Sequence, residues 1–124
     1  MQILKIDEYW LNSESVANHC RSNSSLFDTF MKVETARAIS RSVMIYNLTQ
    51  PIPSLEHAIV AKVYCTEAAL EVASEAIQIL GGYGLTKEFP VEKFYRDARA
   101  SLIEDGINEV LSLEAFDLIL KNYK

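Results

Sequence analysis

The sequence predicts an all-α protein, an up-and-down four-helix bundle, from three observations. The four glycines all fall between residues 81 and 106, and the prolines stand at 51, 53 and 90, so two long stretches carry no helix breaker. Apolar residues recur in steps of three and four along these stretches, which is helical spacing. The 124 residues, 49% of them hydrophobic, suffice for one domain with its own core.

The first two helices are expected over residues 2–21 and 26–48. A polar turn at 21–25 would separate them, with Ser24 or Ser25 as the N-cap of the second helix. The first helix carries an apolar stripe weakened by Ser13: Ile3, Ile6, Trp10, Ala17 and Cys20. The second is expected to bury one face, made of Leu26, Phe30, Val33, Ala36, Ser40 and Val43.

The third helix is expected to follow Pro53 and to end at residue 80. Ser54 suits the N-cap position, and Glu56 suits the positive end of the helix dipole. Gly81 and Gly82 end the helix, because glycine adopts the backbone conformation of a helix C-terminus without steric cost. Small residues dominate the predicted buried face, so another helix can approach closely: Ala58, Ala61, Cys65, Ala68, Val72, Ala76 and Ile79.

Two further helices are expected in the last third of the chain. Pro90 can occupy the first position of a short helix that runs through about Ala100. Gly106 marks a break, and the last helix should run from about Ile107 to Lys121. This helix is apolar on most sides, so we expect it to lie centrally or in an oligomer interface.

The composition argues against several classes of partner. A net charge of −5 without a Lys/Arg cluster disfavours nucleic acid and anionic membranes. No apolar run approaches the ~18 residues of a membrane span, and neither a signal peptide nor a transit peptide is expected. Cys20 and Cys65 are expected to be buried free thiols of a cytoplasmic protein. His19 and His57 lack partners at metal-ligand spacing, so no metal site is expected.

One part of the sequence carries an ordered set of motifs. Residues 78–84 read QILGGYG, residues 89–99 read FPVEKFYRDAR, and residues 103–109 read IEDGINE. The set resembles the C-terminal helical domain of flavin-dependent acyl-CoA dehydrogenases, in which a QxxGGxG loop leads to PVExxxRDA and then to YEGTx(E/Q). The likeness extends upstream through Ala61-Lys62 to the ETAR of residues 34–37.

The resemblance covers residues 30–124 of a single domain that spans residues 1–124. Residues 1–29 are expected to form a divergent N-terminal helix, without the family's RxxFG segment. In the family, a carboxylate removes a proton from the α-carbon of an acyl-CoA, and flavin N5 takes a hydride from the β-carbon. The family builds this pocket from N-terminal helices, a middle β-domain and a C-terminal bundle, and the present chain looks like the bundle alone.

The resemblance implies that Asp105 is the catalytic base, because it falls where the family commonly places its glutamate. Aspartate is one methylene shorter, which withdraws the carboxylate by roughly 1.5 Å. An alternative is that Asp105 caps the last helix, since aspartate is a preferred N-cap residue. Glu104 could replace it as the base only in a different backbone register.

The resemblance also implies contacts with FAD. Gln78, Gly81 and Gly82 match a loop that touches the ADP half of an FAD held mainly by a neighbouring subunit, although a glycine C-cap alone would explain the glycines. Ile107 and Glu109 match positions near the adenine end.

Several positions depart from the family. Ile107 stands where threonine is common, and Ser112 and Asp117 stand where the family tends to carry arginine. An acid in place of a cation beside phosphate would repel the cofactor. Arg96 and Asp97 are interpreted as an ion pair that fixes the short helix.

Two hypotheses for function follow. In the first, the chain is part of an FAD-dependent acyl-CoA dehydrogenase, either as a fragment of a longer product or as a subunit completed by separately encoded domains. Acyl-CoA then binds only to the complete assembly. In the second, it is a non-catalytic stand-alone relic that serves oligomerisation or protein interaction. A lone domain would expose surfaces that its companions cover, so we expect a homo-oligomer.

Overall fold

The computed structural model describes residues 20–122, with side chains from Ser25 onward. It contains the helices α2 (Cys20–Thr49), α3 (Leu55–Leu80), α4 (Val91–Ser101) and α5 (Asn108–Asn122), and the 3₁₀ helix η1 (Gly81–Leu85). Residues 20–122 include no strand, which confirms the all-α prediction. Residues 2–19 of the helix expected over 2–21, His19 among them, lie outside the described residues, and residues 20 and 21 belong to α2.

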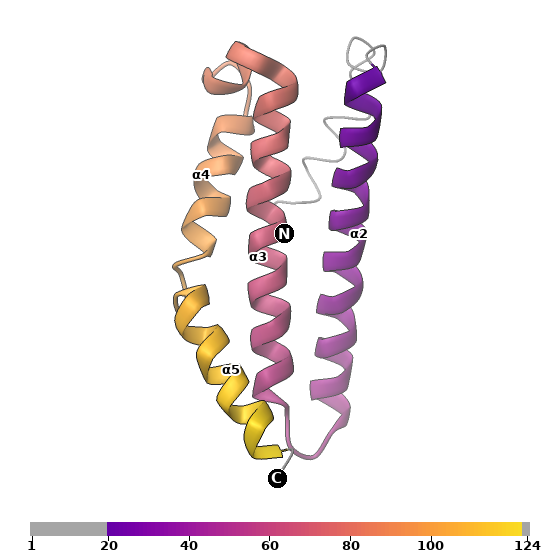
Figure 1. The fold of residues 1–124 in the computed structure, drawn as a ribbon, viewed down its shortest axis with the longest axis vertical. Helices are drawn as coiled ribbons and strands as arrows, with labels where there is room; N and C mark the ends of the chain where they lie inside the picture. The colour runs from indigo at the N-terminus through magenta and orange to yellow at the C-terminus, as the bar shows by residue number, and fades with distance from the viewer. Residues whose placement is uncertain (1–19, 123–124) are drawn as a thin grey trace.

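The helices run up and down around α3 (Figure 1). Helices α2 and α3 lie side by side in opposite directions, and α4 and α5 follow one another along the other side of α3. Helix α3 contacts all three of the other helices, so it is central and α5 lies at an edge. Of the two positions expected for the last helix, the central one is therefore wrong for this chain.

The core lies where α2, α3 and α4 meet. Its buried side chains are Val33, Val72, Ala73, Ala76 and Val91, each at most 2% exposed. Alanines on α3 bring the neighbouring helices close, because they add no side-chain length between the two backbones. The small-residue face predicted for α3 is confirmed at the buried positions Ala61, Ala68, Val72 and Ala76.

Helix α2 begins earlier than predicted. Residues 21–25 are helical, so the turn expected there is wrong. Serine and asparagine are weak helix formers, but their cost per residue is small and packing overrides it. The Ser25 hydroxyl donates to Glu75 Oε1 at 2.8 Å, so it joins α2 to α3. Lys32 and Glu71 make a second link between these helices, at 2.6 Å.

The buried face of α2 is also shifted from the predicted one. Thr29, Val33 and Ala36 are buried, whereas Phe30 is 54% exposed. The positions 29, 33 and 36 follow steps of four and three, so they form a single stripe, and α3 packs against it. The prediction placed Phe30 in this stripe because it is apolar, and the polar Thr29 occupies the position instead.

Both ends of α3 have the predicted caps. The Ser54 hydroxyl accepts from the backbone N–H of His57 at 3.2 Å, and Gly81 follows the last turn with φ of 59°. Asn47 holds the α2–α3 connection, because its amide donates to the Ser54 carbonyl and its oxygen accepts from the Ser54 N–H. The two residues that flank α3, Ser54 and Gly81, therefore set its length.

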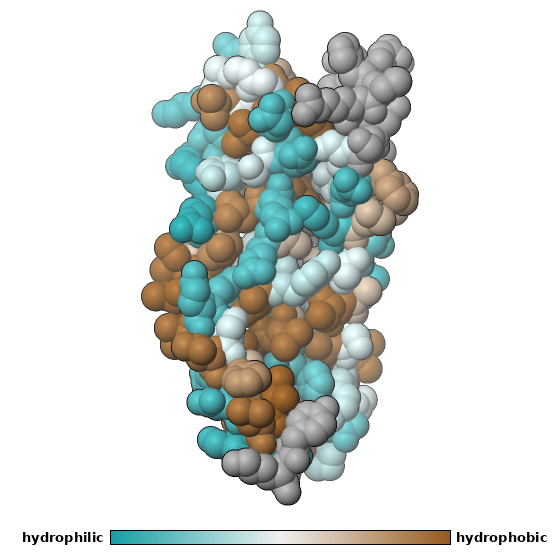
Figure 2. Space-filling view, viewed as in Figure 1, coloured by the Kyte–Doolittle hydropathy of each residue, from teal (hydrophilic) through white to brown (hydrophobic). Residues whose placement is uncertain are grey.

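Many large apolar side chains remain exposed, and Figure 2 shows them on the face in view. They include a strip along α5 and the turn before it, formed by Ile103, Ile107, Val110, Leu113, Phe116 and Leu120. We call this set the α5 strip. Within residues 20–122, no helix is both long and apolar enough to cross a membrane.

Candidate active site and cofactor loop

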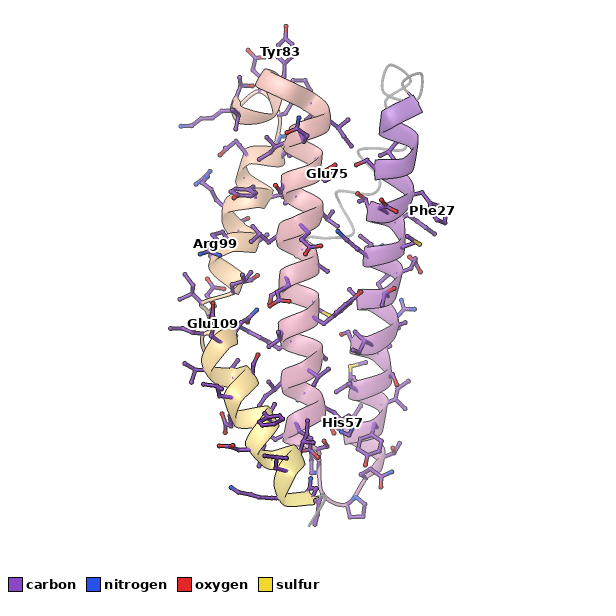
Figure 3. The ribbon with its side chains drawn as sticks, viewed as in Figure 1. Phe27, His57, Glu75, Tyr83, Arg99 and Glu109 are labelled. Atoms are coloured by element: carbon purple, nitrogen blue, oxygen red, sulfur yellow. The ribbon has the colours of Figure 1, made fainter. Side chains whose placement is uncertain are left out.

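The structure places the predicted site residues in two groups. Gln78, Gly81 and Gly82 lie at the end of α3, and Asp105, Ile107 and Glu109 lie at the junction of α4 and α5. The 11 residues of α4 separate the groups by roughly 16 Å, at 1.5 Å per residue. Figure 3 labels a residue near each group: Tyr83 at one end of the molecule, and Glu109 near the middle of its length. All six predicted residues are exposed on this chain.

Asp105 lies in a left-handed turn between α4 and α5. Its φ is 56°, and Gly106 follows with φ of 112°. Aspartate tolerates this region better than most residues that carry a Cβ. Helix α5 begins at Asn108, and the Ile107 carbonyl accepts from the Leu111 N–H at 3.0 Å. The residue at the cap position is therefore Ile107, so the hypothesis that Asp105 is the N-cap of this helix is wrong.

A polar cluster attaches this turn to the middle of α3. The Lys62 ammonium donates to the Gly106 carbonyl at 2.8 Å and to Asn108 Oδ1 at 2.7 Å. Asn108 is 4% exposed, and its amide donates to the Thr66 hydroxyl at 2.9 Å. A buried amide is stabilising only when it is hydrogen-bonded, and this one is bonded through both its oxygen and its nitrogen.

Sequence reasoning missed these three residues, Lys62, Thr66 and Asn108, as parts of the site. The resemblance included Lys62 only as a matched letter, and Asn108 fell at the variable position of the last motif. One observation could have singled them out. Asn108 is a polar residue at the start of an otherwise apolar helix, so it required a partner if that end was buried.

The glycine loop folds back on the end of α3. The Gly81 N–H donates to the Gln78 carbonyl, and Gly84 is buried against the last turns of α3. A Cβ at Gly82 would meet no atom within 4 Å. The side of Gly82 on which a Cβ would stand is thus open to approach from outside the chain.

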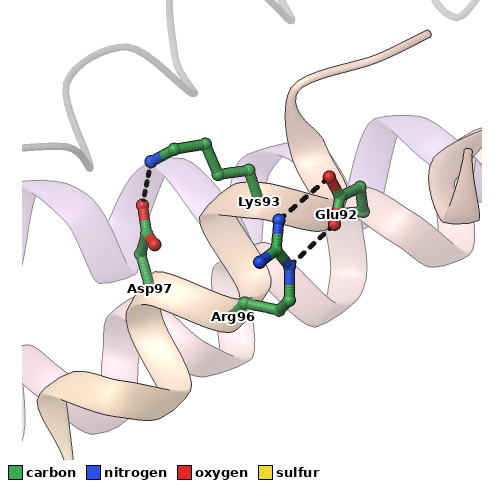
Figure 4. Close-up of polar contacts among 4 residues, drawn as sticks. All are labelled: Glu92, Lys93, Arg96 and Asp97. Atoms are coloured by element: carbon green, nitrogen blue, oxygen red, sulfur yellow. Dashed lines mark hydrogen bonds and ion pairs between the residues drawn. The ribbon is translucent and has the colours of Figure 1, made fainter. Parts of the chain in front are cut away.

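The ion pairs of α4 differ from the predicted one. Arg96 bonds both oxygens of Glu92, at 2.8 and 3.2 Å, and Lys93 bonds Asp97 at 2.5 Å (Figure 4). Residues four apart meet on a helix whereas adjacent side chains diverge, so Arg96 bonds Glu92. The hydrogen bond from Arg96 lowers the pKa of Glu92, and the same bond raises the pKa of Arg96, as the charge of Asp97 also does.

Two other features of the described residues bear on a site. A cavity of about 510 Å³ opens between α2 and α3, lined by Ser25, Asp28, Thr29, Lys32, Leu70, Glu71, Val72, Ser74, Glu75 and Tyr95. Cys65 is a free, half-buried thiol, and burial raises its pKa. No group of three or more His, Cys, Asp or Glu residues is placed to hold a metal ion within the described part of the chain.

Comparison with known proteins gives consistent matches. The sequence model of the family "Acyl-CoA dehydrogenase, C-terminal domain" matches residues 12–115. The mitochondrial short-chain specific acyl-CoA dehydrogenase of Bos taurus is 37% identical over 100 residues, which are 80% of this chain and 24% of that protein. The cyclohexane-1-carbonyl-CoA dehydrogenase of Geobacter metallireducens is 31% identical over 109 residues, which are 87% of this chain and 28% of that protein.

The fold matches as well. The crystal structure of an acyl-CoA dehydrogenase from Slackia heliotrinireducens superposes with a TM-score of 0.82 at 28% identity, and the match covers 98% of this chain and 32% of that one. The chain thus spans only about a quarter of the length of the curated relatives that it matches.

Proposed function

Because this chain belongs to the acyl-CoA dehydrogenase family, whose C-terminal domain it matches over residues 12–115, we propose that it supplies one wall of a flavin-dependent active site. The complete assembly would oxidise the CH–CH group of an acyl-CoA thioester. The remaining walls would come from domains outside this chain. The observation that carries the proposal is the Asp105 turn, an exposed carboxylate held on a family-like fold.

Asp105 would act as the base that removes the α-proton. A general base works within about 3 Å of the proton it abstracts, and it needs a fixed position more than a strong intrinsic basicity. Its anchored turn supplies such a position, because α3 holds it through Lys62 and Asn108. Bound FAD supplies the acceptor for the hydride that leaves the β-carbon. The shorter aspartate side chain would make this base slower than the family's glutamate.

The second group of residues would contact the cofactor of a neighbouring subunit. Gln78, Gly81 and Gly82 would meet its ADP half, and the exposed glycine backbone supports this role. Ile107 and Glu109 would lie near its adenine end. Asp117 is exposed on α5, and its negative charge would repel a phosphate. We therefore expect FAD to bind more weakly here than in a family member with arginine at that position.

We also propose that the chain forms homo-oligomers. The α5 strip places six large apolar side chains on one exposed surface, and such surfaces are typical of interfaces. A second copy seated there would bury the strip.

The proposal is tested with a chimaera. This chain replaces the matching C-terminal region of the Bos taurus relative, and the product is assayed for bound flavin and for oxidation of a short-chain acyl-CoA with a dye as electron acceptor. Asp105→Asn should lower kcat at least a hundredfold, because proton abstraction contributes about 10² to 10⁴ in rate. Asp105→Glu should raise kcat, by up to the order of a hundredfold, because it restores the reach of the side chain.

Glu104→Gln is the matched control, since it removes the neighbouring exposed acid and should leave kcat within about twofold. Flavin content and the unfolding temperature of each variant show that the chimaera is folded and loaded. The proposal fails if a flavin-loaded chimaera keeps its activity in Asp105→Asn. It also fails if the folded chimaera holds no flavin, which would favour the non-catalytic hypothesis.

A further inference from the structure

The turn that carries Asp105 has a conformation that requires outside support. Asp105 and Gly106 are consecutive residues with positive φ, at 56° and 112°. Aspartate enters the left-handed region more readily than most residues with a Cβ, but the conformation still costs free energy that the surrounding structure must offset. The turn itself is exposed, so packing around Asp105 does not supply that support.

One hydrogen bond closes the turn from within, since the Asn108 N–H donates to the Leu102 carbonyl at 3.1 Å, and α3 supports the turn from outside through one cation. Lys62 is half-buried, and its ammonium bonds the Gly106 carbonyl and the Asn108 side chain, so it grips the chain immediately after Asp105. Thr66, one turn further along α3, accepts from the Asn108 amide and in turn bonds the carbonyls of Lys62 and Val63. Two residues of α3 thus hold both ends of a single buried amide.

Electrostatics argues against a role in helix stability for this lysine. A cation at a helix N-terminus meets the positive end of the helix dipole, so its position beside the start of α5 is unfavourable for the helix itself. The lysine is compensated by the two oxygens that it bonds, and one of them belongs to the turn. The contacts of Lys62 thus make the turn more rigid, while its positive charge is unfavourable for the N-terminus of α5.

We propose that Lys62 is a positioning residue for Asp105: its ammonium fixes the α4–α5 turn, and the turn fixes the carboxylate. The geometric part, that Lys62 fixes the turn, is inferred from the contacts of Lys62 alone. The consequence for catalysis rests on the proposed function.

The geometric part is tested by amide hydrogen exchange, measured by NMR on the 124-residue chain. Lys62→Met keeps the aliphatic stem and removes the donor. The Asn108 N–H, which donates to the Leu102 carbonyl across the turn, should exchange about tenfold faster or more. The amides of the α3 core, at Val72 and Ala73, should stay within about twofold. Lys93→Met is the matched control, because it removes an exposed lysine of α4 and should change neither set.

Thr66→Val provides a second route if Lys62→Met does not fold. This substitution removes the hydroxyl that accepts from the Asn108 side chain, with little change in volume. It should accelerate hydrogen exchange of the backbone N–H of Asn108, by a smaller factor than Lys62→Met does. Unchanged exchange at Asn108 in the folded variants would overturn the proposal. So would an equal acceleration at Asn108 and in the α3 core, because that pattern shows a general loss of stability.

The catalytic part is tested in the chimaera. Lys62→Met should lower kcat about tenfold or more with KM within about twofold, and Lys62→Arg, which retains a donor, should recover part of the loss. An unchanged kcat in an active chimaera would contradict the catalytic part. If a folded chimaera that keeps Lys62 shows no activity, that result counts against the proposed function alone. The role of Lys62 in fixing the turn is tested separately by the exchange experiment, which needs neither flavin nor substrate.

Discussion

Gly84 packs directly on the backbone of Ile77. A Cβ at position 84 would lie 2.9 Å from both the Cα and the carbonyl oxygen of Ile77, and 3.2 Å from the Cβ of Leu80. This contact folds η1 back over the end of α3. It also fixes where the exposed Gly81–Gly82 backbone lies, because those two residues connect α3 to the packed glycine.

Gly84→Ala should therefore destabilise the chain by about 2 kcal/mol, because backbone atoms cannot move aside as a flexible side chain can. Urea unfolding followed by circular dichroism measures the change. Gly82→Ala is the matched control, since its Cβ would meet nothing within 4 Å, and it should change the stability by less than about 0.5 kcal/mol. Equal effects at the two glycines would show that η1 does not pack as described.

The N-terminus of α3 gives a second prediction. Ser54→Ala removes the hydroxyl that accepts from the His57 N–H, and it should cost about 1 kcal/mol of unfolding free energy. Ser74→Ala, at an exposed position inside the same helix, should be neutral or slightly stabilising because alanine is the better helix former. Thermal unfolding of both variants checks the difference. A Ser54→Ala protein as stable as the parent would contradict the cap.

The Arg96–Glu92 pair predicts a pH dependence with a definite sign. Arg96 lowers the pKa of Glu92 from its ordinary value of 4.5, so the folded chain favours the ionised carboxylate. The stability from this pair is present above the pKa of the unfolded chain and is lost as pH falls through the lower, folded pKa. The pair lies at the surface, with Arg96 exposed and Glu92 half-buried, so salt should weaken the effect.

NMR titration of the Glu92 carboxylate checks this prediction. Arg96→Gln should raise the pKa of Glu92 toward 4.5, whereas Arg99→Gln, on the same helix, should leave it where it is in the parent. A pKa of Glu92 that does not respond to the loss of Arg96 would rule out the pair in solution.

The α5 strip predicts a change in oligomeric state. Phe116→Glu places a charge in the middle of the strip, so it should raise the dissociation constant of the proposed homo-oligomer by about tenfold or more. Ile52→Glu is the control, because Ile52 is apolar and 83% exposed but lies in the α2–α3 connection. Sedimentation velocity compares the two. If only Ile52→Glu dissociates the assembly, the interface lies on the α2–α3 connection and not on α5.

The fold was predictable from the sequence where local chemistry decides it. Ser54 and Gly81 set the ends of α3 because a cap and a positive φ each require particular residue types. Pro90 and Gly106 likewise mark the ends of α4 to within a residue or a short turn. These signals are properties of single residues and their immediate neighbours, so a sequence displays them directly.

Features set by packing between helices were not predictable in this way. Thr29 is buried and Phe30 exposed because α3 contacts one particular stripe of α2, and the spacing alone does not fix that phase. The Lys62–Asn108 contact joins residues 46 positions apart, so it depends on how α3 and α5 align. The resemblance identified Asp105 as a candidate base, but only the backbone showed a left-handed turn in place of a helix cap.

The most direct test of the proposal that this bundle forms one wall of a shared site is a fluorescence titration of FAD into the purified 124-residue chain. We predict no saturable binding in the micromolar range, because every predicted cofactor contact is exposed on the surface of this chain. The chimaera measured alongside should bind FAD stoichiometrically. Tight, stoichiometric FAD binding by the isolated chain would contradict the account, and turnover of acyl-CoA by the same sample would refute it.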